Sequence, residues 1–120
     1  MKFVTHQDEQ IDTNGSHRQG YIKADYKDLV ELFGRPGDGD GYKVDWEWDI
    51  LFEDGTIATI YNWKSGPNYG YYDVGPGHIK EWNVGGFSQD ALNNIRLLLA
   101  NKAPEPTTKK EEYQRWVFFT

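Results

Sequence analysis

Cysteine is absent from this sequence of 120 residues. Disulfide bonds, thiolate catalysis and cysteine-based zinc sites are therefore excluded. The chain also lacks an apolar run of membrane-spanning length, and its first ten residues, MKFVTHQDEQ, lack the continuous apolar stretch of a signal peptide. Its length and high aromatic content predict one folded domain, and the composition suits a reducing cytosol.

Positive charge is scarce, with 13 Lys and Arg residues against 19 Asp and Glu residues. Seven of the acidic residues lie between Asp38 and Asp54, where Lys43 is the only base, so this window carries the whole formal net charge of −6. Binding to a nucleic-acid backbone normally needs a basic patch. We therefore expect no direct nucleic-acid binding.

The acidic window contains part of a calcium-binding pattern. Asp38, Asp40, Gly41 and Glu47 have the spacing of an EF-hand loop. However, Pro36 stands where the first carboxylate belongs, and the last position falls in a predicted strand instead of at the start of a helix. We predict no metal site and no cofactor.

A strand, a tight turn and a second strand are predicted over 43–63. Apolar and acidic residues alternate from Val44 to Glu53, which is the period of a half-buried strand. Asp54-Gly55 favours a two-residue type I′ turn, which would pair Glu53 with Thr56. The predicted buried face then holds Trp46, Trp48, Tyr61 and Trp63, and the predicted exposed face holds Asp45, Glu47 and Asp49.

The sequence predicts an α+β fold, in which the hairpin 43–63 and a strand at 79–84 form a small antiparallel sheet. Two helices, 26–33 and 89–101, are expected to pack on this sheet. Asp25 is the predicted N-cap of the first helix, with Asp28 three residues later in an approximate capping box.

Three parts of the chain are distinguished by composition. Residues 1–17 are predicted to be a flexible arm, and 18–102 the folded domain. Residues 103–120 are predicted to be a linker and an apolar segment that packs back on the domain or on a partner, including a second copy of the chain.

No catalytic motif is present. His6, His17 and His78 have no metal-binding spacing, and the sequence contains neither a nucleophile elbow nor a phosphate-binding lysine loop. We predict no catalytic residues and no enzymatic activity. The enzymatic alternative is a metal-dependent reaction on the acidic strand face, although such a face is more often simply solvated.

Two surfaces are candidates for binding. An acidic surface fits a basic partner protein by charge complementarity, and its residues are Asp38, Asp40, Asp45, Glu47 and Asp49. The glycine- and tyrosine-rich loop 65–78 fits a small nucleotide ligand, because tyrosine offers a large contact area at low entropic cost. The candidate residues for this second site are Asn62, Lys64, Asn68, Tyr69, Tyr71, Tyr72 and Arg96.

The segments ADYKDLVELFGRP, DWEWDILFEDGTIATIYNWKSGPNY and WNVGG resemble a family of small proteins encoded by tailed bacteriophages. The helix-then-hairpin layout also looks like the small α+β units of beta-lactamase inhibitor proteins. The phage resemblance carries no assigned activity, but it implies a protein of the host cytoplasm that antagonises host defence. It implies either an inhibitor of the anti-CRISPR kind, which binds a defence protein through the acidic face, or a sponge that sequesters a nucleotide immune signal.

Overall fold

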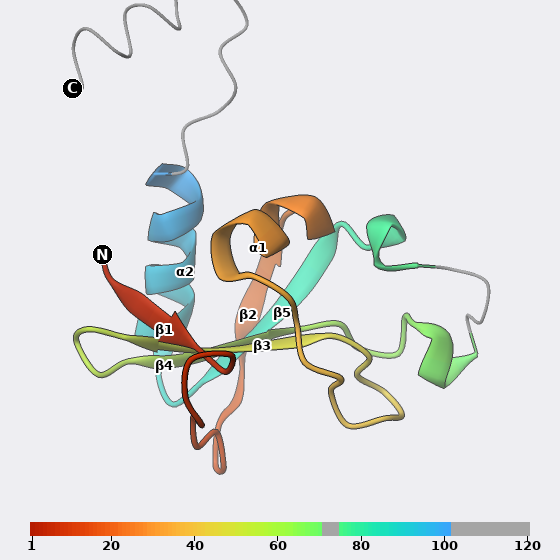
Figure 1. The fold of residues 1–120 in the computed structure, drawn as a ribbon, viewed down its shortest axis with the longest axis horizontal. Helices are drawn as coiled ribbons and strands as arrows, with labels where there is room; N and C mark the ends of the chain where they lie inside the picture. Colours follow the sequence, from red (N-terminus) through yellow and green to blue (C-terminus); the bar gives the residue numbers. More distant parts are fainter. Residues whose placement is uncertain (71–74, 102–120) are drawn as a thin grey trace, which may run out of the picture.

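A computed structural model describes residues 1–70 and 75–101 of the chain (Figure 1). It contains a five-stranded antiparallel sheet and two helices, which confirms the predicted α+β class. The strands, in the sheet order β1-β3-β4-β5-β2, are β1 (Phe3–Thr5), β3 (Glu47–Phe52), β4 (Ile57–Tyr61), β5 (Glu81–Gly86) and β2 (His17–Lys23). The helices are α1 (Tyr26–Phe33) and α2 (Gln89–Asn101), and two short 3-10 helices, η1 (Pro67–Tyr69) and η2 (Pro76–His78), lie between β4 and β5.

Both helices cover the same face of the sheet, and the hydrophobic core lies between them and the strands (Figure 1). Trp48 on β3 and Trp82 on β5 are fully buried there, with their rings edge to face at 5.4 Å. The apolar residues of each helix recur at helical spacing, so each helix buries one stripe. These residues are Leu29 and Phe33 of α1, and Ala91, Leu92, Ile95 and Leu98 of α2. No described helix covers the opposite face, which we call the helix-free face.

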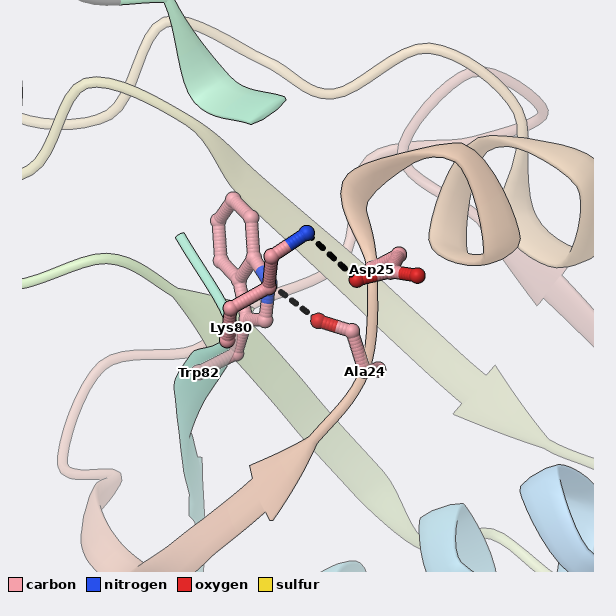
Figure 2. A network of polar contacts seen from close by, with 4 residues as sticks. All are labelled: Ala24, Asp25, Lys80 and Trp82. Carbon is pink, nitrogen blue, oxygen red and sulfur yellow. Dashed lines mark hydrogen bonds and ion pairs between the residues drawn. The ribbon is translucent and has the colours of Figure 1, made fainter. Parts of the chain in front are cut away.

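The start of α1 differs from the predicted capping box. Asp25 is the N-cap residue, but its side chain makes no capping hydrogen bond. Its carboxylate instead accepts from Lys80 Nζ at 2.9 Å, and Trp82 Nε1 donates to the neighbouring Ala24 carbonyl at 3.2 Å (Figure 2). The ion pair is exposed and contributes little stability, so these contacts mainly fix where α1 leaves the sheet.

Part of the predicted N-terminal arm belongs to the sheet. Phe3–Thr5 form the edge strand β1, in which Phe3 pairs with Phe52 and Thr5 with Ile50. The Phe3 ring also packs against Phe33 of α1, with ring centres 5.2 Å apart. The prediction failed here because three residues are too few to show a strand period. The predicted linker and C-terminal segment at 103–120 lie outside the described residues.

The turn between β3 and β4 is one residue longer than predicted. Gly55 N donates to Phe52 O, and Phe52 N donates to Thr56 O. Gly55 lies in the left-handed region, with φ 89°, whereas Asp54 does not. This is the three-residue hairpin in which a type I turn is followed by a left-handed glycine, and not the predicted type I′ turn.

The longer turn reverses the predicted faces of β4. Trp48 pairs with Ile60, and Ile50 pairs with Ala58. A one-residue change of register moves every side chain of a strand to the other face of the sheet. Ala58 and Ile60 therefore enter the core, whereas Tyr61 is only half-buried and Trp63 is exposed. The predicted core ladder that included Tyr61 and Trp63 is wrong.

Trp48→Ala should lower the free energy of unfolding by about 3–5 kcal/mol, because it empties a large, fully buried aromatic site. Trp63→Ala is the matched control, since the same side chain is 47% exposed there, and it should cost less than about 1 kcal/mol. Urea denaturation of both variants measures the difference. Equal losses would contradict the hairpin register.

Candidate functional site

Asp45 does not join an exposed acidic row. It is buried, and Asn62 Nδ2 donates to its carboxylate at 3.0 Å. Asn62 Oδ1 accepts from the backbone N of Asp45 at 2.8 Å and of Trp46 at 3.0 Å. A side chain at Gly66 would overlap the Asp45 carboxylate, so glycine makes room for this contact. Asn62 is itself only 1% exposed. The sequence predicted that Asp45 contacts a partner and that Asn62 contacts a ligand. In the structure both residues are buried, and their contacts with each other hold the chain together at the end of the hairpin.

Asp38 and Asp40 lie in the exposed loop before β3, which is joined to this strand by two backbone hydrogen bonds between Gly37 and Glu47. Asp40 Oδ1 accepts from the backbone N of Val44 at 2.9 Å and of Tyr42 at 2.8 Å. The hydrogen bond from Val44, assisted by that from Tyr42, lowers the pKa of Asp40. This carboxylate therefore organises its own loop. In residues 1–70 and 75–101, no three His, Asp or Glu side chains lie together as metal ligands.

Glu47 and Asp49 form a pair of carboxyl groups on β3, on the helix-free face. Burial raises the pKa of Glu47 to about 8, and a hydrogen bond to Asp49 and the negative charges of Asp49 and Asp40 act in the same direction. Asp49 Oδ1 is buried and has no hydrogen-bond partner among the described residues. The raised pKa of Glu47 favours its protonated form at neutral pH, and this proton can be donated to Asp49.

The five predicted acidic binding residues differ in burial and setting. Glu47 and Asp49 lie on β3, Asp38 and Asp40 lie in the adjoining loop, where the charge of Asp40 acts on Glu47, and Asp45 is buried. The same arrangement weakens the metal-dependent enzyme alternative, which needs several ionised carboxylates facing one point.

A different group of side chains gathers beyond the end of the hairpin. Lys43 Nζ lies 5.4 Å from the centre of the Trp63 ring and 5.7 Å from that of Tyr42. Lys64 Nζ lies 5.8 Å from the Trp63 ring centre and 5.7 Å from that of Tyr69. The rings of Tyr42 and Tyr69 are 5.4 Å apart. We call these five residues the aromatic–lysine cluster.

The backbone brings the cluster together from three segments. Lys64 N donates to Lys43 O at 2.7 Å, which joins the residues after β4 to the loop before β3. Lys64 lies in the left-handed region, with φ 57°, which turns the chain sharply after Trp63. Tyr69 then arrives on η1, whose backbone closes through a bond from Tyr69 N to Gly66 O.

The cluster is open to solvent, and within the described residues its two lysines have no acidic partner in a salt bridge. Tyr42, Trp63 and Tyr69 are 56%, 47% and 37% exposed. Neither Lys43 nor Lys64 forms a salt bridge with a described residue, although the chain has an excess of acidic side chains. Exposed rings can stack on a planar group, and lysines beside these rings can attract an anion at the same place.

Of the predicted nucleotide-binding residues, the structure brings Lys64 and Tyr69 together in this cluster. Arg96 lies elsewhere, on α2, where it donates to the Tyr21 carbonyl at 3.3 Å. Asn68 lies in η1. Tyr71 and Tyr72 lie outside the described residues.

Sequence reasoning missed Tyr42, Lys43 and Trp63. Trp63 was assigned to the core because the hairpin register was off by one residue. Lys43 was counted only as the one base of the acidic window, and Tyr42 was not singled out. The sequence did contain one sign of this site, which is Asp40 close before Tyr42 and Lys43. An aspartate that accepts hydrogen bonds from the backbone of its own loop predicts a fixed turn, in which the next side chains face solvent.

No described helix is long and apolar enough to cross a membrane. Comparisons with protein-family models, curated proteins and solved structures give no match.

The carboxyl pair predicts a pH dependence of stability. The folded-state pKa of Glu47 is about 8, above the ordinary value of 4.5, so the folded chain binds the extra proton. Stability should therefore fall as pH rises between these values. Glu47→Gln keeps a donor for Asp49 and removes the titration. It should be more stable than the wild type at pH 9 by about 1–2 kcal/mol, a figure discounted because Glu47 is partly solvent-exposed.

Thermal unfolding between pH 4 and pH 9 measures this effect. Glu81→Gln is the control, because Glu81 is an exposed carboxylate on the neighbouring part of the sheet and should leave the pH profile of the wild type unchanged. A Glu47→Gln profile that keeps the wild-type slope would contradict the raised pKa of Glu47.

Proposed function

We propose that this protein is a non-catalytic binding protein that captures a small anionic ligand with a flat ring, such as a nucleotide, through the aromatic–lysine cluster. The environment of Trp63 carries the proposal. Its indole is exposed beyond the sheet, with the ammonium groups of Lys43 and Lys64 at 5.4 and 5.8 Å from the ring centre. A base could stack on the ring while a phosphate group meets the lysines.

The cluster offers a nucleotide two kinds of favourable contact, stacking on a ring and attraction to two lysines. Stacking of one base on an aromatic side chain contributes about 1–3 kcal/mol. The lysines add attraction to phosphate without first breaking a salt bridge to a described residue. The contact between the Tyr42 and Tyr69 rings restricts their motion before the ligand arrives, which reduces the entropic cost of binding.

The phage resemblance gives this binding a biological role. A protein that holds a nucleotide immune signal in the host cytoplasm would lower its free concentration and prevent the defence from being activated. Such a sponge needs affinity and abundance but no catalytic group. The competing hypothesis, an inhibitor that binds a basic host protein through the acidic face, has less support because Asp45 is buried and Glu47 holds a proton at neutral pH.

Trp63→Ala should weaken nucleotide binding by about tenfold or more, because the ring that stacks on the base is lost. Calorimetric titration of the full chain with the dinucleotide ApA measures this, and ribose 5-phosphate, which has a phosphate but no base, should bind much more weakly than ApA. Phe87→Ala is the matched control, since Phe87 is a similarly exposed ring, 49% accessible, outside the cluster.

A complementation assay tests the biological role. Phage that carry Trp63→Ala or Lys64→Ala should lose protection against a defended host, and phage with Phe87→Ala should keep it. Binding of ApA by Trp63→Ala at the wild-type affinity would refute the cluster as the site. Failure of the wild type to bind either dinucleotides or any small molecule released from infected cells by heat would refute the sponge.

A further inference from the structure

A second group of polar side chains borders the aromatic–lysine cluster. A cavity of about 550 Å³ opens on the helix-free face, and it is lined by Arg18, Tyr61, Trp63 and Asn83. This volume lies within the range of small-ligand pockets. Trp63 belongs to both the cavity and the cluster, so the two adjoin at this ring.

Arg18 carries the only positive charge of the cavity lining. Its Nε donates to Asn83 Oδ1 at 2.9 Å, which orients the guanidinium group. The two terminal nitrogens make no hydrogen bond to a described residue, and Arg18 forms no salt bridge within the described chain. An arginine held by Nε and free at its terminal nitrogens can donate two parallel hydrogen bonds to a phosphate group.

The pairing of β2 with β5 places Arg18 beside the cavity. The register between β2 and β5 shifts between Arg18 and Gly20, and Arg18 lies opposite Gly85. A side chain at Gly85 would overlap Thr59 Oγ1 and would touch the Tyr61 ring at 3.4 Å. Because residue 85 is a glycine, the Tyr61 side chain has room to lie over β5, where it lines the cavity together with Arg18.

The neighbouring groups of the cavity are compatible with an anion. Burial raises the pKa of Tyr61, while the charge of Arg18 acts in the opposite direction, so the phenol remains a neutral hydrogen-bond donor. Glu47 pairs with Tyr61 across the strands and holds a proton at neutral pH. A protonated Glu47 repels an anion less than a carboxylate does, and the proximity of Glu47 also acts to raise the pKa of Tyr61.

We infer that Arg18, oriented by Asn83, forms a second anion subsite that adjoins the aromatic–lysine cluster, so that the ligand is a nucleotide with two separated phosphate groups. This inference rests on the proposed function and specifies its ligand class. One base stacks at Trp63 with a phosphate group near Lys43 and Lys64, and the other phosphate group reaches Arg18. Cyclic dinucleotides, and linear dinucleotides that also carry a terminal phosphate, have this chemistry, whereas ApA and a nucleoside monophosphate do not.

The test compares two ligands that have the same two bases but differ in phosphate number. Cyclic di-AMP carries two phosphodiester groups, and ApA carries one. In calorimetric titrations of the full chain, the wild type should bind cyclic di-AMP about tenfold or more tightly than ApA. Arg18→Gln should remove this advantage and leave the affinity for ApA within about twofold. Lys23→Gln is the control, because it removes an exposed cation from the same strand, outside the cavity.

Each outcome separates the two proposals. If Arg18→Gln binds cyclic di-AMP like the wild type while Trp63→Ala does not, the second subsite is wrong and the proposed function stands. If Arg18→Gln weakens both ligands equally, Arg18 belongs to a single anion site, which also overturns the inference. If the wild type binds neither ligand and no other nucleotide, the proposed function itself fails. Unchanged melting temperatures of Arg18→Gln and Lys23→Gln would establish that both variants remain folded.

Discussion

The position of Gly55 in the β3–β4 turn determines both the core and the candidate site. Because this glycine alone adopts the left-handed conformation, the turn has three residues and Trp48 pairs with Ile60. The same register sends Tyr61 and Trp63 away from the core. With the two-residue turn, Trp63 would lie among the core residues, and neither the aromatic–lysine cluster nor the cavity beside Arg18 could form. One backbone conformation thus decides whether two aromatic side chains stabilise the protein or face solvent.

The sequence predicted those parts of the fold that depend on local periodicity. The bounds of α1 and α2, and the inward positions of Trp82 and Val84 on β5, follow from spacing within one segment. The relative register of two strands cannot be predicted in this way. Alternation shows that a strand has two faces, but not which residues of the neighbouring strand lie on the same face. Strand β1 was also missed, since its three residues become a strand only through pairing with β3.

The candidate site was harder to predict than the fold, because charge counts do not include burial or protonation. Seven acidic residues in one window suggested a continuous anionic face. In the folded chain, Asn62 holds Asp45 in the interior, and Asp40 accepts backbone hydrogen bonds within its loop. The cations, in contrast, are dispersed along the sequence. Lys64 follows Trp63 in the sequence, but Arg18 and Lys43 come close to Trp63 only through the fold, so no sequence window contains a basic patch.

The formal net charge of −6 and a cationic site are physically compatible, and together they restrict the class of ligand. At physiological ionic strength, charges separated by more than about 8 Å of solvent are largely screened. Lys43 and Lys64 flank Trp63, and Arg18 lines the cavity beside it. The Asp40 carboxylate, however, accepts hydrogen bonds from the backbone on either side of Lys43, so negative charge also lies near the site. Under the proposed function we therefore expect binding to need direct contact between phosphate groups and these three cations, which a short, doubly charged nucleotide can make without also meeting the acidic side chains that a long nucleic acid would approach.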